Sequence, residues 1–397
     1  MKAFFTSYFG LLVFCCICCR PNTALPDNAP ERPQAFLHVG PPKTGSTYLQ
    51  DIMEKFPKQL ESQHVLMPRE KPGGNFVKHF TLRHLDTALA YESHKHFINS
   101  SSYGVYSQYI AQVVATPGAK ALLSDEDFFN APLLLKELLS GFDVTVIYVY
   151  RDELSRLLSG CNQMMKTSHD VLISSCASFI QVQHSSPHVN PGFFPEQSNL
   201  DAFKSWVKDF KIIDMYGAMA AKQDLGHVFF CEVMGVLCNL TANGLEDKVQ
   251  TNPAIHSEKI LLLRRLFDQY AKRRGCPSTP HGSHGGHFVD ETSDDIMIQF
   301  FKFAKGTAYE SPQDWPLITY NLYPQVLYSM EHYRNFRDSE YGASFLYGNG
   351  TANNEASVKA SQRSELNSFA MLMDPVVQNI FDKILHHIVK KKKCKHY

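Results

Sequence analysis

The chain has 397 residues, of which 44% are hydrophobic and 20% are charged, as in a globular protein with a sizeable core. This length is enough for one large domain or two small ones. The 39 Lys and Arg residues balance the 39 Asp and Glu residues, so no overall field points to nucleic acid as a partner. Any anion-binding site must therefore be local.

The N-terminal segment differs in composition from the rest. Lys2 precedes a run from Ala3 to Cys19 that is apolar apart from Thr6 and Ser7. A basic residue before such a run is typical of a signal peptide, and the run is marginal for a membrane span, which needs roughly 17–25 residues. We expect a signal peptide or short signal anchor over residues 1–24 and a linker over 25–34, and hence a Golgi lumenal or membrane location, or secretion after cleavage.

Cysteines and glycosylation sequons agree with such a compartment. Six cysteines lie outside the apolar N-terminal run, a number that permits disulfides in an oxidising lumen. They are Cys161, Cys176, Cys231, Cys238, Cys276 and Cys394. Three N-x-[ST] sequons predict glycosylation at Asn99, Asn239 and Asn349.

The first predicted element is a buried strand over 35–39, and the second is a helix that begins at Ser46 and buries Tyr48, Leu49, Ile52 and Met53. A strand, a tight turn and a helix N-terminus form an anion site, because the first N–H groups of a helix lack partners within it. The helix dipole adds positive potential at the same place. We therefore expect an anion between the strand and the helix.

The order of residues in this loop indicates which anion binds. Gly40 and Gly45 have the five-residue spacing of a Walker loop, but that loop needs Lys directly after its second glycine. Here Lys43 comes two residues before Gly45 instead. The predicted phosphate ligands are Pro42, Lys43, Thr44, Gly45, Ser46 and Thr47.

Further strands are predicted along the chain. Residues 121–125 and 144–150 read as buried strands, and a fourth strand is predicted over 228–233. Helices are expected over 133–139, 200–210, 257–274 and 376–388, the last followed by a basic tail at 390–395. Alternating strands and helices predict a parallel sheet flanked by helices, with ligands at the carboxyl ends of its strands.

Polar residues follow two of these strands. Asp125 is the last residue of the strand over 121–125, and Glu126 follows it. Arg151 directly follows the strand over 144–150. Ser159 lies eight residues after Arg151, about two turns into the next helix, so a guanidinium and a hydroxyl could hold a second phosphate.

The two motifs together resemble a known family. Pro42-Lys43-Thr44-Gly45-Ser46-Thr47 resembles the 5′-phosphosulfate loop of sulfotransferases that use 3′-phosphoadenylyl sulfate (PAPS), and the Arg151…Ser159 spacing resembles their 3′-phosphate motif. Further similarities are the segment 122–126 and the run 251–255 that leads into a helix with Arg264. The resemblance covers about residues 35–275, and it departs from the family at Asp125, where the family usually has Ser.

The resemblance implies a three-layer α/β/α fold of the P-loop, nucleoside-kinase-like type with a central parallel sheet. It also implies PAPS as sulfuryl donor and a catalytic domain over 35–275. Residues 276–397 are then expected to be a helical extension of the same domain. Lys43 would neutralise charge on the bridging oxygen and the departing phosphate. The acceptor hydroxyl needs a general base. Glu126 and His79 are both candidates, and Asp125 is a weaker third.

The compartment favours a carbohydrate or related glycan as acceptor. Two other functions stay open. A kinase that uses ATP would need the Walker order and an acidic Mg²⁺ ligand, and a non-catalytic secreted module would keep the fold without binding PAPS. His281, His284 and His287 lie in a Gly- and Ser-rich stretch, and we expect no metal requirement. Nucleic acid is not an expected partner.

Overall fold

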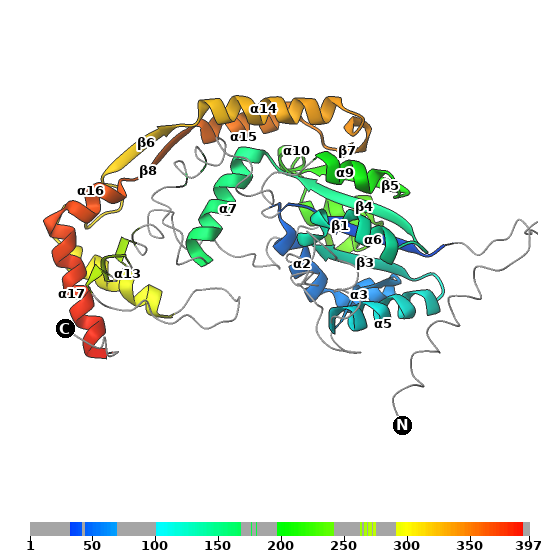
Figure 1. Cartoon of the computed structure of the whole chain (residues 1–397), viewed down its shortest axis with the longest axis horizontal. Helices are drawn as coiled ribbons and strands as arrows, with labels where there is room; N and C mark the ends of the chain where they lie inside the picture. The colour runs from blue at the N-terminus through cyan, green and yellow to red at the C-terminus, as the bar shows by residue number, and fades with distance from the viewer. Residues whose placement is uncertain are drawn as a thin grey trace, which may run out of the picture.

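The computed structural model describes residues 32–41, 44–69, 101–167, 197–241 and 291–391, together with 176, 180, 263, 266, 267, 269–271, 273 and 274. Its centre is a six-stranded parallel sheet with helices on both faces (Figure 1). This is the three-layer α/β/α fold that the sequence predicts.

The strand order across the sheet is β2-β3-β1-β4-β5-β7, and every neighbouring pair is parallel. The strands are β1 (Gln34–Val39), β2 (Val65–Leu66), β3 (Lys120–Asp125), β4 (Asp143–Tyr150), β5 (Asp209–Asp214) and β7 (Phe345–Leu346). The central strands are buried almost throughout because helices cover both faces, which explains their nearly continuous apolar sequences.

Side chains that alternate along the strands divide into two cores. Leu37 and Tyr148 pack on one face, and Phe36 and Ile147 pack on the other. The first face is covered by α5 (Ser101–Ala115), α6 (Pro132–Leu138), α9 (Gln197–Lys204) and α14 (Tyr323–Asp338). The second face is covered by α2 (Ser46–Lys55), α3 (Pro57–Ser62), α10 (Met215–Ala220) and the π-helix η5 (His227–Val233).

A third core lies beside the sheet and is built around α7 (Glu153–Thr167). It also includes α13 (Glu291–Ala304), α16 (Ser368–Met373) and α17 (Pro375–Lys391). A two-stranded antiparallel ribbon, β6 (Leu317–Asn321) and β8 (Gln362–Leu366), leads from this core to α14 and to α15 (Gly350–Ser361) (Figure 1). Short elements complete the fold: η2 (Asp127–Asn130), α11 (Cys238–Thr241) and η6 (Gly342–Ser344).

Two buried aspartates tie α14 and α15 to the sheet. Asp152, just after β4, accepts hydrogen bonds from Ser329 of α14 (2.7 Å) and Ser357 of α15. Asp214, the last residue of β5, accepts hydrogen bonds from the Tyr333 hydroxyl (2.8 Å) and the Asn353 amide (2.6 Å). Both carboxylates are essentially inaccessible to water, so these polar contacts fix α14 and α15 against the carboxyl edge of the sheet.

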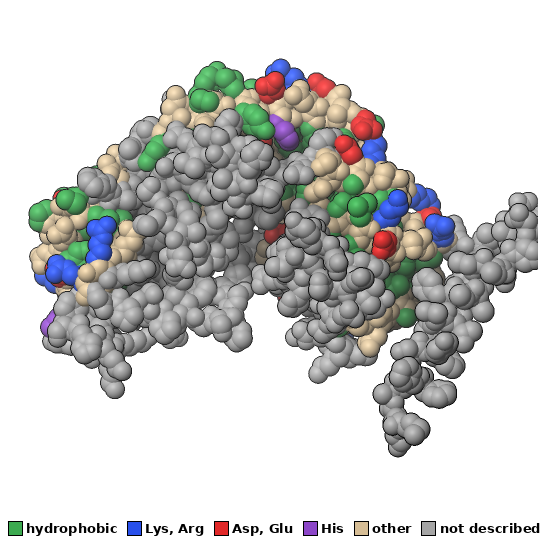
Figure 2. All heavy atoms as spheres, in the orientation of Figure 1, with side chains coloured by type: hydrophobic (Ala, Val, Ile, Leu, Met, Phe, Trp, Pro, Cys, Tyr) green, Lys and Arg blue, Asp and Glu red, His purple; other side chains and the backbone are tan. Residues whose placement is uncertain are grey.

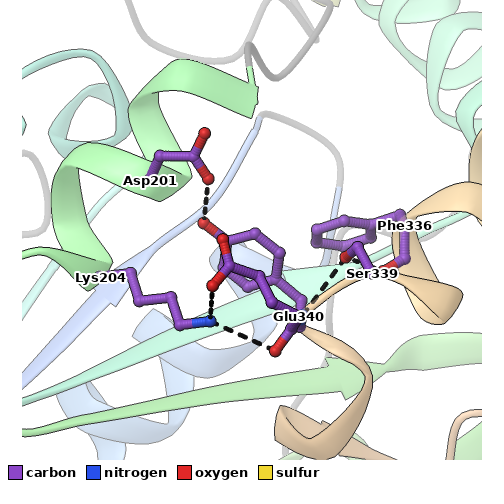
Figure 3. Close-up of polar contacts among 6 residues, drawn as sticks. Asp201, Lys204, Phe336, Ser339 and Glu340 are labelled. Atoms are coloured by element: carbon purple, nitrogen blue, oxygen red, sulfur yellow. Dashed lines mark hydrogen bonds and ion pairs between the residues drawn. The ribbon is translucent and has the colours of Figure 1, made fainter.

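Contacts at the C-terminal end of α14 join it to α9 (Figure 3). The Tyr341 hydroxyl donates to Asp201 at 2.6 Å, and the Lys204 ammonium contacts the Glu340 carboxylate at 2.6 Å. The same ammonium lies 4.8 Å from the centre of the Tyr341 ring. These interactions close the helical layer over the first core.

Two disulfides lie within the described residues. One joins Cys161 of α7 to Cys176 in the third core, and the other joins Cys231 of η5 to Cys238 of α11. Cys276 and Cys394 lie outside the described residues.

Two predicted elements are wrong. The helix expected over 200–210 ends at Lys204, and Phe210 belongs to β5, where it shares a face with Ile212. The strand expected over 228–233 is the π-helix η5, whose residues Val228 to Phe230 are buried. The periodicity of a short apolar run does not distinguish a buried strand from a buried helix. In the structure, Asp224 Oδ1 accepts a hydrogen bond from His227 N (3.0 Å) at the start of this helix.

Candidate functional site

The carboxyl ends of β3, β1 and β4 meet at one edge of the sheet, with β1 in the middle. After β1 the chain continues to β2 and β3 on one side, and after β4 it continues to β5 on the other side. The strand order therefore reverses between β1 and β4. Such a reversal leaves a crevice at the carboxyl edge, where open α/β sheets bind their ligands. The loop that follows β1 and Arg151, which follows β4, both lie at this point.

The loop after β1 ends at a left-handed glycine. Gly45 has φ 90° and precedes the first residue of α2. A side chain at this position would be strained, and its Cβ would lie 2.6 Å from Leu225 Cδ2. Thr44 is fully buried and donates its hydroxyl to Pro41 O at 3.0 Å, whereas Thr47 is exposed. The Thr44 hydroxyl therefore supports the loop through this hydrogen bond.

The side chain of Glu126 contacts Ser46, the first residue of α2. The Ser46 hydroxyl donates a hydrogen bond to Glu126 Oε1, and Ser46 itself is buried. The first turn of α2 contains no acidic residue of its own. The Glu126 carboxylate, supplied from the end of β3, thus interacts favourably with the positive end of the helix dipole. A predicted general base and a predicted phosphate ligand are therefore hydrogen-bonded to each other.

Sequence reasoning assigned no role to His38, the fifth residue of β1. Its Nδ1 lies 2.8 Å from Ser124 Oγ on the neighbouring strand. Burial lowers the pKa of His38 to about 4, so the ring is neutral near pH 7. Within the described residues, His38 Nε2 has no hydrogen-bond partner, and it lies 3.9 Å from where a Cβ on Gly40 would be. A buried polar atom is thus left beneath the predicted phosphate loop.

The second predicted phosphate site begins where β4 ends. Arg151 directly follows β4 and is half-buried, and Ser159 is half-buried on α7. Asp152 Oδ1 accepts a hydrogen bond from Ser155 N at 2.8 Å, which caps the start of α7. The helix start is therefore held beside Arg151 by a buried carboxylate.

Arg156 is a second residue that sequence reasoning did not single out. The whole residue is 2% exposed, and burial lowers its pKa. Within the described residues, neither Nη atom of Arg156 has a hydrogen-bond partner. Tyr148 and Tyr150, from the strand that leads to Arg151, act in the opposite direction and favour a higher pKa of Arg156. The signal in the sequence that could have pointed to Arg156 is its position between Arg151 and Ser159, within the predicted second phosphate motif.

Asp125 is the last residue of β3 and is buried. Strand alternation places its side chain on the face opposite that of Ser124, whose hydroxyl meets His38 on the face of α2. Of the two carboxylates at the end of this strand, the structure therefore brings Glu126, and not Asp125, to the start of α2.

Several predicted residues lie outside the described residues. They are Pro42, Lys43, His79, Asn99, the run 251–255, Arg264, His281, His284 and His287. Among the described residues, no group of three or more His, Cys, Asp or Glu side chains is arranged to hold a metal ion. No helix in the described ranges has both the length and the apolar character needed to cross a membrane. The first 31 residues fall outside those ranges.

Asn239 and Asn349 are both exposed. Asn239 is in the short helix α11, next to the disulfide-bonded Cys238. Asn349 precedes α15, and its Oδ1 accepts hydrogen bonds from the backbone N–H groups of Thr351 and Ala352 at 3.0 and 3.2 Å. The Oδ1 of Asn349 is thus engaged in capping, and its Nδ2 is the atom to which a glycan would attach.

Comparison of the whole chain with models of protein families and with curated proteins finds no match.

Proposed function

We propose that this protein is a sulfotransferase that transfers the sulfuryl group of PAPS to a hydroxyl of a carbohydrate or related glycan. The observation that carries the proposal is the position, at the reversal of strand order, of two motifs that the sequence predicts to bind anions. One is the loop between β1 and α2, and the other is Arg151 with the start of α7, after the adjacent strand β4. PAPS has two separate phosphate groups, and two neighbouring anion motifs suit it.

The donor is held at both ends in this proposal. The N–H groups at the start of α2, with Lys43 and Ser46, bind the 5′-phosphosulfate, and Arg151 and Ser159 bind the 3′-phosphate. The acceptor oxygen attacks sulfur while the bond from sulfur to the 5′-phosphate oxygen breaks. The pair of electrons stays on that phosphate, whose growing charge Lys43 stabilises.

The proton of the acceptor hydroxyl passes to a general base, for which Glu126 and His79 are the candidates. Glu126 is supported by its contact with Ser46, which brings a carboxylate next to the proposed phosphosulfate site. General bases must lie within hydrogen-bond reach of the proton that they remove. His79 lies outside the described residues, so its candidacy rests on the sequence alone.

The test is to compare ligands and then to follow transfer. Calorimetry without Mg²⁺ should detect adenosine 3′,5′-bisphosphate and much weaker binding of ATP. Incubation with labelled PAPS and a panel of glycans should then move the label. Lys43→Ala should lower the transfer rate by about 10²–10³-fold at saturating donor, whereas Lys55→Ala, at the exposed end of α2, should not. Tight Mg²⁺-dependent binding of ATP without binding of the bisphosphate would refute the proposal.

A place in the secretory pathway is part of the proposal, and it carries the choice of acceptor. Two disulfides and two exposed sequons support it, because disulfides persist mainly in oxidising compartments. Protein made in eukaryotic cells should gain mobility on a gel after endoglycosidase treatment. Asn239→Gln and Asn349→Gln should each remove part of that shift. A cytosolic protein without glycans would remove the reason for a glycan acceptor.

A further inference from the structure

A pocket of about 450 Å³ opens between the C-terminal half of α14 and the first turn of α15. This volume is within the range of small-molecule sites, roughly 300–1,000 Å³. The polar residues that line it are Tyr333, Arg334, Arg337, Asn349, Thr351 and Asn354. Within the described part of the chain, no Asp or Glu contributes to this lining. The pocket therefore combines two cations with amide and hydroxyl groups.

Arg337 is held in one orientation. Its Nε and Nη2 donate to Asp338 Oδ1 at 3.1 and 3.0 Å, and its Cζ lies 5.9 Å from the centre of the Tyr333 ring. Its Nη1 lies against the start of α15, because a Cβ added to Gly350 would be only 2.7 Å away. Unlike Nε and Nη2, Nη1 makes no hydrogen bond with the residues that the structure describes. A cation that is fixed in advance loses little entropy when it binds a ligand.

The positive charge here is only partly offset. Asp338 pairs with Arg337, but Arg334 makes no hydrogen bond or ion pair with any part of the chain that the structure describes. The first turn of α15 contains no acidic residue, so the positive end of its dipole adds to the two arginines. Apolar side chains gather over the N-terminal half of α14, whereas both basic and acidic side chains lie over its C-terminal half (Figure 2). An anion would compensate this charge.

One residue of the pocket is hydrogen-bonded to the strand next to β4. Tyr333, which lines the pocket, donates its hydroxyl to Asp214 at the carboxyl end of β5. The strand β5 is the neighbour of β4, which leads to Arg151. Tyr333 therefore connects the pocket to the carboxyl edge of the sheet, at which the donor site is proposed.

We infer that this pocket binds a sulfate- or carboxylate-bearing sugar unit. The anionic group contacts Arg334 and Nη1 of Arg337, and the sugar hydroxyls contact the Asn354 amide and the Thr351 hydroxyl. The need for an anion follows from the two arginines, whereas the choice of a sugar rests on the proposed function. A glycan on Asn349 would lie at the rim and compete for this space.

Calorimetry tests the inference without any nucleotide. The protein is made in the bacterial periplasm, where disulfides form and no N-glycan is attached, and is titrated with a sulfated disaccharide and with its unsulfated form. The sulfated form should bind more tightly. Arg334→Gln and Arg337→Gln should each weaken its binding about tenfold or more, the loss of one charge-assisted hydrogen bond. Lys359→Gln is the control: it also removes one positive charge, but at a position about 13 Å along α15 from its first residue, Gly350. It should leave binding of the sulfated disaccharide unchanged.

The inference would be overturned by equal binding of both disaccharides, by unchanged binding in both arginine variants, or by an equal loss in Lys359→Gln. Displacement of the sulfated disaccharide by adenosine 3′,5′-bisphosphate would also overturn it, by assigning the pocket to the donor. Thermal melting checks that each variant is folded. Arginine-dependent binding by a protein that transfers nothing from PAPS would refute the proposed function and leave the inference standing, and transfer without such binding would do the reverse.

Discussion

The Ser46 hydroxyl donates a hydrogen bond to the Glu126 carboxylate, although 80 residues separate the two in the sequence. Parallel pairing of β1 with β3 brings them together, because it places Val39 opposite Asp125, the last residue of each strand. A carboxylate thus lies where the donor phosphate is proposed to bind. Donor and carboxylate would compete for Ser46, and their like charges would repel.

This relationship predicts opposite effects of Glu126→Gln on binding and on chemistry. The amide removes the negative charge, so adenosine 3′,5′-bisphosphate should bind about tenfold more tightly, a change of about 1.4 kcal/mol. Sulfuryl transfer should slow by about 10²–10⁴-fold if Glu126 is the general base. Glu355→Gln, an exposed residue of α15, is the matched control. Transfer at the wild-type rate would leave His79 as the base, and unchanged affinity would show that the carboxylate does not compete with phosphate.

The central strands were predictable because burial on both faces leaves a strong signal. The runs over 35–39, 121–125 and 144–150 correspond to β1, β3 and β4 within one residue at each end. The helix after the loop also begins at Ser46 as predicted, with Leu49, Ile52 and Met53 buried, although Tyr48 is only half-buried. These elements position the candidate site, so most of its framework could be predicted.

Elements that depend on distant partners were not predictable. The two residues of β7 form a strand only because β5 lies beside them, and β6 needs β8, which follows it more than 40 residues later. The bond between His38 and Ser124 likewise needs the register of two strands, which no local pattern contains. The roles of Asp152 and Asp214 as anchors for α14 and α15 need the third layer in place.

Arg151→Ala should weaken binding of the donor more than it slows chemistry, because in the proposal Arg151 contacts a phosphate remote from sulfur. Loss of one charge-assisted hydrogen bond costs about 1.5–3 kcal/mol, which is about 10–150-fold in Kd. Calorimetry with adenosine 3′,5′-bisphosphate measures the loss, and single-turnover transfer at saturating donor should stay near the wild-type rate. Arg69→Ala, which removes an exposed ion pair with Glu61, is the control. An unchanged Kd would assign Arg151 a purely structural role.

His38 should make the stability of the protein depend on pH. Burial lowers its pKa from the ordinary 6.5 to about 4, so the folded state favours the neutral ring. The stabilisation is complete above pH 6.5 and is lost as the pH falls from 6.5 towards 4. Between pH 7.5 and pH 5, the wild type should lose about 2 kcal/mol more of its free energy of unfolding than His38→Gln does.

The measurement for His38 is urea denaturation at the two pH values with the disulfides intact. His64→Asn is the control, because His64 is exposed and its φ of 61° suits asparagine. This control should keep the pH dependence of the wild type. An identical loss in wild type and His38→Gln would mean that the buried ring does not titrate in this range.

Asp152→Ala should loosen α14 and α15 together. The side chain is 1% exposed, and its Oδ2 accepts hydrogen bonds from Ser329 and Ser357, one on each helix. Unsatisfied buried hydroxyls cost about 1–3 kcal/mol, and the lost cap of α7 adds about 1 kcal/mol. Hydrogen exchange should therefore rise in both helices, and urea denaturation should give the total loss. Asp314→Ala, at an exposed turn, is the control and should leave exchange unchanged.

Asp152→Ala also tests whether residues 276–397 belong to the sheet domain. If α14 and α15 only rested on the surface of that domain, removal of Asp152 would leave their hydrogen exchange as in the wild type. A double-mutant cycle with Ser357→Ala isolates one contact, since the two losses should not add if the hydroxyl and the carboxylate interact directly. Additive losses, or faster exchange confined to α7, would contradict the anchoring role of Asp152.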